Sequence, residues 1–501
     1  MIKRFLSLLL LIAGLPLFAQ PSADALKYAG LISEEGLRDK LSIIASDALE
    51  GRMTGTRGQK MAAAFIAHHF REIGLKGPVN GGYEQTVPLT QITPGENSLT
   101  VGTEQLEHFK DMFFLGFEET NGLTGAPAIF TGYGTTDEVA GLTLTNKAAV
   151  VMLKEPGLSA FGTAMETAAR LRGKGALTVL FIPGGTEEEF DQTASAIRGW
   201  MGSGMLTLDG KAGIDLQAFF IRRRVAEKIF SVPFAKLEDY TSKKNLKKVR
   251  EARISWKNTF TTERITSENV LGYLEGTDKK DELIIVTAHF DHVGANGKGS
   301  DKIFNGADDD GSGTVSVMQI AEAFAKAAKE GKRPRRSMLF MTVTGEEEGL
   351  FGSQWYVSNP VFPLASTVVD LNIDMIGRRD PGHAENRNYV YAIGSDKLST
   401  ELHNLHEQVN KSTLGMDLDY TYNDQNHPDR LYYRSDHWNF AKNNIPIIFY
   451  FDGIHEDYHK VSDEVSKIDF DILQRRATLV FHTAWEIANR DKRIEPDPGK
   501  R

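Results

Sequence analysis

Four apolar runs in the second half of this chain each lead directly into an acidic residue or a histidine. The runs occupy residues 282–289, 337–345, 367–374 and 445–452 of the 501-residue sequence. Their β-branched residues, without polar alternation, are typical of strands buried on both faces of a parallel sheet. Ligands of open α/β sheets bind outside the carboxyl ends of the strands. The pattern therefore predicts an α/β fold, with a mixed, mainly parallel sheet flanked by helices and a polar site at one edge.

Two acidic clusters, Asp308–Asp310 and Glu346–Glu348, lie where such a site would form. The first precedes a helix that the spacing of apolar positions predicts over residues 312–327, and a helix N-terminus tolerates carboxylates well. The second directly follows one of the predicted strands. A solvated run of charge is not expected in either place, so both clusters are candidates for binding divalent metal.

A hydrolytic zinc site needs imidazole and carboxylate ligands and a base that takes a proton from water. A bridged two-metal site also needs one ligand that both ions share. The best ligand candidates near the strand ends are His289, Asp309, Glu347, Asp374 and His459. Asp309 suits the bridge and Glu346 suits the base. The neighbouring Asp308, Asp310 and Glu348 are expected to be bystanders.

Charge and cysteine content exclude several classes of protein. A formal net charge of -9 argues against a nucleic-acid partner, which needs a basic face. The absence of cysteine excludes disulfides, thiolate zinc sites and a cysteine nucleophile. Lys3 and Arg4 precede an apolar stretch over residues 5–18, which predicts a signal peptide over residues 1–19. We therefore expect a periplasmic or secreted protein without stable membrane insertion after cleavage.

The order of predicted elements indicates an insertion. Residues 22–95 and 260–490 are expected to form one domain, and residues 100–255 form a separate α/β unit that contains few histidines or clustered carboxylates. The charged, proline-containing tail at residues 491–501 is expected to be disordered.

Five short strings in this order resemble the ligand motifs of the M28 zinc peptidases, a family that includes secreted bacterial aminopeptidases. They are A-H-F-D-H-V-G at 288–294, G-A-D-D-D-G-S-G at 306–313, T-G-E-E-E-G-L-F-G-S at 344–353, N-I-D-M-I-G at 372–377 and Y-H-K at 458–460. The resemblance covers residues 269–489 and the helical region at 41–75, and it implies the zinc exopeptidase fold. The segment at 100–255 resembles an inserted protease-associated (PA) domain.

The resemblance also implies a role for each matching residue. His289 and Asp374 would hold one Zn²⁺, Glu347 and His459 a second, and Asp309 would bridge them. Glu346 would be the general base. Asp291 would orient His289, and Tyr458 would donate a hydrogen bond to the tetrahedral intermediate.

These observations predict an exported dizinc metallo-exopeptidase that acts on peptide substrates, most simply an aminopeptidase. The sequence leaves the oligomeric state and the side-chain preference open. A carboxypeptidase of the same fold would need a placed cation, for which Arg378 and Arg379 are candidates.

Three further alternatives are less consistent with the sequence. A glutaminyl cyclase-like enzyme would need only one zinc ion. A single-zinc protease would use H-E-x-x-H at 455–459, but no apolar helical face accompanies that motif. A receptor-like binding protein would lack the intact ligand set. His292, His437 and His455 are expected to be structural.

Overall fold

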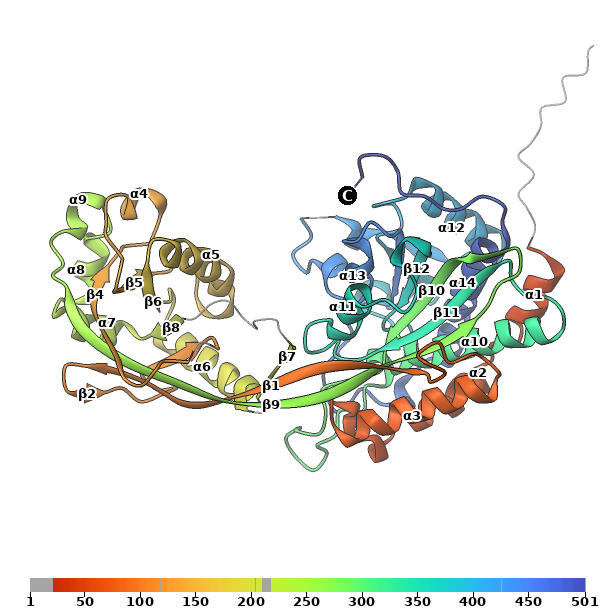
Figure 1. The fold of residues 1–501 in the computed structure, drawn as a ribbon, viewed down its shortest axis with the longest axis horizontal. Coiled ribbons are helices and arrows are strands. Elements are labelled where there is room, and N and C mark those ends of the chain that lie inside the picture. The colour runs from red at the N-terminus through yellow and green to blue at the C-terminus, as the bar shows by residue number, and fades with distance from the viewer. Residues whose placement is uncertain (1–20, 118, 203, 210–217, 425, 501) are drawn as a thin grey trace, which may run out of the picture. The chain divides into compact units, whose positions relative to one another are not determined.

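The computed structural model describes residues 21–117, 119–202, 204–209, 218–424 and 426–500. The chain divides into two compact units, of which the first combines Met1–Val87 with Thr266–Arg501 and the second is Pro88–Ile265. The second unit is therefore inserted in the sequence of the first (Figure 1). The predicted signal peptide lies outside the described residues. Within the described ranges, no helix combines the length and apolarity needed to cross a membrane.

The first unit is built on a mixed sheet in the order β14-β13-β15-β12-β10-β11-β9. Its central strands β11, β10, β12 and β15 are parallel, whereas β9 is antiparallel to β11 and β13 is antiparallel to β15. The strands are β9 (Ala252–Leu274), β10 (Lys279–His289), β11 (Arg336–Val343), β12 (Thr367–Ile373), β13 (Tyr389–Ile393), β14 (Asp417–Asp419) and β15 (Ile447–Phe451). All residues of β11, β12 and β15 are buried, as the uninterrupted apolar runs predict.

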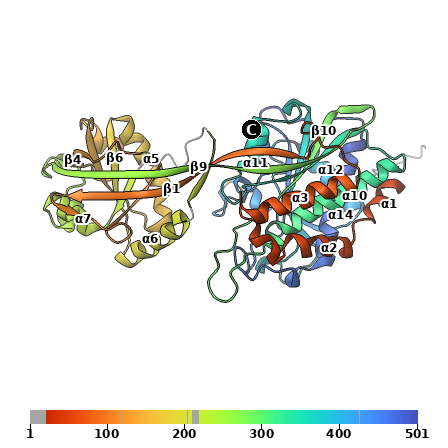
Figure 2. The ribbon, with the colours of Figure 1, turned by 60° about the horizontal axis from the view of Figure 1, so that its bottom comes forward.

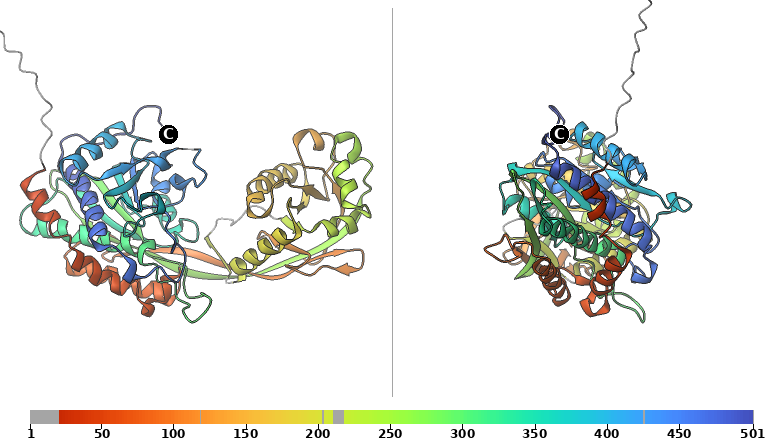
Figure 3. Two further views of the ribbon diagram at one scale, coloured as in Figure 1. Left: turned by 180° about the vertical axis from the view of Figure 1, so that it is seen from behind. Right: turned by 90° about the vertical axis from the view of Figure 1, so that its right-hand side faces the viewer.

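Helices cover both faces of this sheet. One face packs against α1 (Ala23–Ala29), α2 (Glu34–Ile44), α3 (Arg57–Glu72), α10 (Gly313–Lys329), α12 (Thr400–Ser412) and α14 (Phe470–Asn489). Figure 2 shows α2, α3, α10 and α14 lying together over that face, and Figure 3 shows the violet-blue α14 from two further sides. The other face packs against the short α11 (Phe351–Ser358) and α13 (His437–Ala441). The first unit therefore has two apolar layers around one sheet.

The second unit is a smaller α/β structure. The first half of β9 continues the order β9-β4-β5-β6-β8-β3 here, and β1 pairs with β2 and β7. The remaining strands are β1 (Glu84–Val101), β2 (Glu104–Gln105), β3 (Met112–Leu115), β4 (Thr124–Phe130), β5 (Lys147–Met152), β6 (Ala176–Ile182), β7 (Met205–Leu208) and β8 (Ala218–Ile221). The helices are α4 (Thr136–Val139), α5 (Ala160–Gly173), α6 (Glu187–Gly202), α7 (Arg223–Phe230), α8 (Phe234–Asp239) and α9 (Lys243–Leu246). One apolar layer includes α5 and α6, and the other includes α7, α8 and α9.

The predicted fold class is confirmed, because the first unit has a mainly parallel sheet with helices on both faces. The predicted disorder of the tail is wrong for residues 491–500. Ile494 is only 1% exposed, and the Asp497 backbone N–H donates to the carbonyl of Leu398. Asp497 also accepts a hydrogen bond from the backbone of Thr400 at 2.9 Å. The tail is charged, but its one apolar side chain and these polar contacts fasten it to the first unit.

Candidate metal centre

The strand order places the candidate ligands at a point where the chain changes direction across the sheet. From β10 the chain passes through α10 to β11 on one side, and it returns to the other side of β10 to form β12. Such switch points leave a crevice outside the carboxyl ends of the strands. His289 is the last residue of β10 and Asp374 follows β12 directly. Glu347 lies just beyond β11, so three ligand candidates from separate strands meet at one edge.

The five predicted ligands lie within reach of one another around Asp309. Nε2 of His289 lies 3.3 Å from Oδ1 of Asp309 and 3.5 Å from Oδ1 of Asp374. Nε2 of His459 lies 3.0 Å from Oδ2 of Asp309 and 3.1 Å from Oε2 of Glu347. Each oxygen of Asp309 therefore faces a different histidine. The arrangement has two halves that share one carboxylate.

The charges of these groups suit a divalent cation. Burial raises the pKa of Asp309, but hydrogen bonds from His289 and His459 outweigh it and hold that pKa well below the usual range. Burial lowers the pKa of His459, but its hydrogen bonds with Asp309 and Glu347 raise it to about 10. Asp309 Oδ2 is also buried and makes no hydrogen bond of good geometry among the described residues. A cation that replaced the protons shared by these carboxylates and imidazoles would balance their negative charge and occupy their free oxygen and nitrogen atoms.

Glu346, the base predicted from the sequence, lies beside these groups. Its Oε2 lies 4.0 Å from Nε2 of His289, and its backbone N–H donates to Oδ1 of Asp291 at 3.2 Å. Burial raises the pKa of Glu346 well above its usual value, and the carboxylates of Asp374 and Glu347 raise it further against the opposing effect of His289. A carboxylate with a raised pKa is suited to accept and return a proton near neutral pH.

Asp291 acts on His289 differently from the expectation. The nearest acceptor for Nδ1 of His289 is the backbone carbonyl of Asp291 at 3.2 Å, whereas the Asp291 carboxylate lies 3.8 Å away. That carboxylate accepts hydrogen bonds from Oγ1 of Thr54 at 2.8 Å and from the Glu346 backbone. In this structure the Asp291 side chain therefore holds the Glu346 loop, and its carbonyl orients the histidine.

Tyr458 lines a cleft that Asp309, Glu346, Glu347 and Asp374 also line. Its ring stacks on His459 with 4.0 Å between the ring centroids, and its Oη accepts a hydrogen bond from Nη2 of Arg434 at 3.3 Å. Arg434 also lines the cleft. No spacing in the sequence relates Arg434 to the predicted ligands, so it was not among the predicted site residues.

Asp308 and Asp310 belong to the support of the centre. Asp310 accepts from the backbone N–H groups of Gly313, Met375 and His289 at 2.9, 3.0 and 3.2 Å. Asp308 accepts from the backbone N–H of Gly377 at 2.7 Å and contacts Nε2 of His455 at 3.1 Å. The two flanking aspartates therefore fasten the acidic turn to neighbouring segments.

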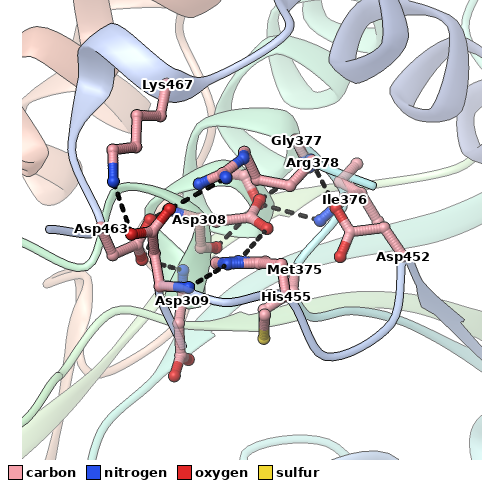
Figure 4. Close-up of polar contacts among 12 residues, drawn as sticks. Asp308, Asp309, Met375, Ile376, Gly377, Arg378, Asp452, His455, Asp463 and Lys467 are labelled. Carbon is pink, nitrogen blue, oxygen red and sulfur yellow. Dashed lines mark hydrogen bonds and ion pairs between the residues drawn. The ribbon is translucent and has the colours of Figure 1, made fainter. Parts of the chain in front are cut away.

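Asp463 supports the same turn, as Figure 4 shows. Its carboxylate accepts from the backbone N–H of Asp308 at 3.0 Å and of Asp309 at 3.1 Å. Asp463 lies on the segment that carries His459, so these bonds hold His459 near Asp309. Asp463 was not among the predicted site residues, although its position four residues after His459 was the available signal.

Two alternatives from the sequence find no support in this geometry. Neither His455 nor His459 lies in a helix, and His455 faces Asp308 whereas His459 faces Asp309, so H-E-x-x-H does not direct both rings to one point. Arg378 contacts Asp457 at 3.0 Å and Glu456 at 3.4 Å, and Arg379 donates to the carbonyl of Ala384 at 2.6 Å. Arg434 is the better-placed cation for a substrate carboxylate.

The fold is an α/β sheet, and the imidazole and carboxylate groups at its strand ends form a candidate metal site. Residues 269–484 match the sequence profile of Peptidase family M28.

The solved structures agree on the fold. The aminopeptidase from Aneurinibacillus sp. strain AM-1 is 19% identical with a TM-score of 0.59, over 95% of this chain and 98% of that one. BSAP, a zinc aminopeptidase from Bacillus subtilis, is 18% identical with a TM-score of 0.52, over 93% of this chain and 98% of that one. At such identities the likeness shows the fold alone.

The curated relatives match over shorter segments. A probable glutamate carboxypeptidase of Arabidopsis thaliana is 34% identical over 108 residues, which are 21% of this chain and 14% of that protein. The chain spans only 10%, 8% and 14% of the length of the first three curated relatives that it matches.

Proposed function

We propose that this chain is a zinc-dependent aminopeptidase that holds two zinc ions. The observation that carries the proposal is the position of Asp309 between two histidine-carboxylate groups, with each of its oxygens turned to a different histidine. His289 and Asp374 would hold one ion, Glu347 and His459 the other, and Asp309 both. Imidazole and carboxylate donors of this kind are the usual ligands of zinc.

Zinc bound here would supply Lewis acidity, which polarises a carbonyl and lowers the pKa of water. The chain's own residues do the rest of the work. Glu346 takes the proton of the attacking water and returns it to the departing amine. Tyr458 donates its hydroxyl proton in a hydrogen bond to the carbonyl oxygen as charge develops there. Asp291 keeps the Glu346 loop in place through the Glu346 backbone N–H.

The cleft also supports a choice of substrate. Its wall beside the ligands is apolar, and Met375, Leu431, Phe449, Phe451 and Ile454 line it. A free N-terminal ammonium group would be attracted to the buried carboxylates, and an apolar first side chain would fit against this wall. Peptides with a free amine and a large apolar N-terminal residue are therefore the proposed substrates.

A carboxypeptidase is the second candidate, and Arg434 is the observation that favours it. Its guanidinium lies at the cleft beside Tyr458, where it could pair with a C-terminal carboxylate. The relative in Arabidopsis thaliana is named as a carboxypeptidase of this kind.

Hydrolysis of matched peptides distinguishes the two candidates. Leucyl peptides with a free amine, their N-acetylated forms and their C-terminal amides would be compared at saturating zinc. The proposal predicts loss of turnover on N-acetylation and retention on C-terminal amidation. The opposite pattern would establish the carboxypeptidase, and indifference to both changes would contradict an exopeptidase.

The proposal also covers the export of the protein and the kind of domain that the second unit forms. We infer that the protein is exported after cleavage of residues 1–19, and that residues 100–255 form a PA-like domain. N-terminal sequencing of the protein from the periplasm or medium should begin at Gln20. An intact N-terminus at Met1 in that fraction would contradict cleavage.

A further inference from the structure

His292 contacts a proposed metal ligand, although the sequence suggested only a structural role for it. It follows β10 by three residues and is 1% exposed. Its Nδ1 lies 2.7 Å from Oε1 of Glu347. Since a carboxylate oxygen can only accept, the imidazole donates from Nδ1.

This bond divides the work of the two Glu347 oxygens. Oε1 accepts from His292, and Oε2 lies 3.1 Å from Nε2 of His459 in the proposed metal site. A carboxylate held at one oxygen keeps a defined direction at the other. Without His292 the Glu347 side chain could rotate and turn either oxygen, or neither, toward the site.

The ring of His292 contacts one carboxylate and lies near a second. Its Nδ1 is 2.7 Å from Oε1 of Glu347 and 3.9 Å from Oδ2 of Asp309, and these three groups are close enough together to hold an ion. The short contact with Glu347 favours a hydrogen bond to that carboxylate, and a role for His292 as a ligand is the alternative that the test must separate.

The backbone holds the ring in this position. Gly306 has a φ of +55°, and a Cβ added there would lie 2.6 Å from ring atoms of His292. The His292 backbone N–H donates to the carbonyl of Arg52 at 3.2 Å. The close approach of Gly306 and this backbone bond leave the ring little freedom to swing Nε2 toward the ligands.

We propose that His292 is a positioning residue that orients Glu347 so that Oε2 alone faces the metal. The inference rests on the ligand set in the proposed function. It predicts that His292 affects the affinity of one of the two ions, the one bound by Glu347, and leaves the ion bound by His289 and Asp374 unaffected.

The test is zinc titration of the metal-free full-length protein against a chelating dye, which measures the two affinities separately. His292→Ala should lower the affinity for the ion bound by Glu347 by about 10- to 100-fold, which is the usual effect of removing the hydrogen-bond partner of a metal ligand. His292→Asn, whose amide N–H takes the position of Nδ1, should restore affinity to within a few-fold. His406→Ala, which also removes a buried imidazole from the first unit, is the matched control and should leave both affinities unchanged.

The outcomes separate this inference from the proposed function. If His292→Ala binds both zinc ions as tightly as the wild type does, the positioning role is overturned. Complete loss of one ion in both His292→Ala and His292→Asn would make His292 a ligand and overturn it as well. Wild-type protein that binds fewer than two zinc ions would overturn the ligand assignment and this inference together. If His292→Ala does not fold, His292→Gln replaces it, because its longer side chain places the amide away from the Nδ1 position.

Discussion

The two units of this chain are both helix-covered sheets, yet they bury very different side chains. Around the strand ends of the first unit the buried set includes Asp291, Asp309, Asp374 and Asp436. In the described part of the second unit, the buried polar side chains are neutral except for Arg222, which pairs with Glu187 at 2.6 Å. Burying unpaired charge costs free energy, so a fold keeps such a cluster where function needs it. The contrast favours the first unit as the place of the proposed chemistry.

Removal of metal should have the largest effect and should act on the first unit alone. Chelation by EDTA should abolish hydrolysis, and added zinc should restore it. Without the cation, the carboxylates around Asp309 repel one another. Hydrogen exchange should therefore accelerate at residues 306–312 and 453–463, and the second unit should keep its protection. Hydrolysis that persists under chelation would contradict a metal-dependent mechanism.

Glu346→Gln should have the next largest effect. Loss of a general base reduces kcat by about 10²- to 10⁴-fold. Zinc content, measured by mass spectrometry, should stay at the wild-type value because Glu346 is not a proposed ligand. Glu187→Gln on α6 is the matched change in the second unit and should leave kcat intact. Near-normal turnover by Glu346→Gln would remove it from the mechanism.

Leu431→Ala should change substrate preference rather than metal binding. Leu431 lies in the apolar cleft wall, so kcat/KM for leucyl substrates should fall by about tenfold, with less effect on alanyl substrates. Leu206→Ala in β7 of the second unit makes the same truncation outside the cleft. An equal loss for both substrates, or for both variants, would show that this wall does not select the side chain.

His406 should make the first unit sensitive to acid. Burial lowers the pKa of His406 to about 3, whereas an unfolded histidine titrates near 6.5. Its contribution to stability is therefore complete above about pH 6.5 and is lost as the pH falls toward the folded value, by about 1.4 kcal/mol per pH unit. His406→Phe should flatten this fall in urea unfolding with EDTA present throughout. An unchanged slope would show that other groups cause the acid sensitivity.

Arg222→Ala should have the smallest effect on catalysis. Loss of its pairs with Glu187 and Asp191 should lower hydrogen-exchange protection of α6 and α7. Zinc content and kcat for small aminoacyl substrates should remain within about twofold, since the second unit contributes none of the proposed ligands. A large fall in zinc content would mean that the second unit supports the metal site.

The fold followed from local sequence patterns because buried parallel strands and amphipathic helices repeat over short distances. The helix α14 and the strand β12 lie where apolar periodicity and an uninterrupted apolar run predicted them. The same patterns placed His289 and Asp374 at strand ends. The tail was misjudged because its order depends on contacts with Leu398 and Thr400, which are distant in sequence.

The support of the site was harder to predict than its candidate ligands. Asp463, Thr54 and Arg434 reach the centre through loop conformations that no periodicity describes. His292 is only three residues from His289, but the sequence alone does not distinguish a histidine that positions a ligand from one that has only a structural role. Which oxygen of Glu347 each neighbour engages depends on the folded geometry alone.

Anomalous diffraction at the zinc edge tests the central claim most directly. Crystals of the full-length protein grown with zinc should show two peaks, one beside His289 and Asp374 and the other beside Glu347 and His459, with Asp309 between them. A single peak, or peaks away from Asp309, would contradict the bridged two-zinc centre.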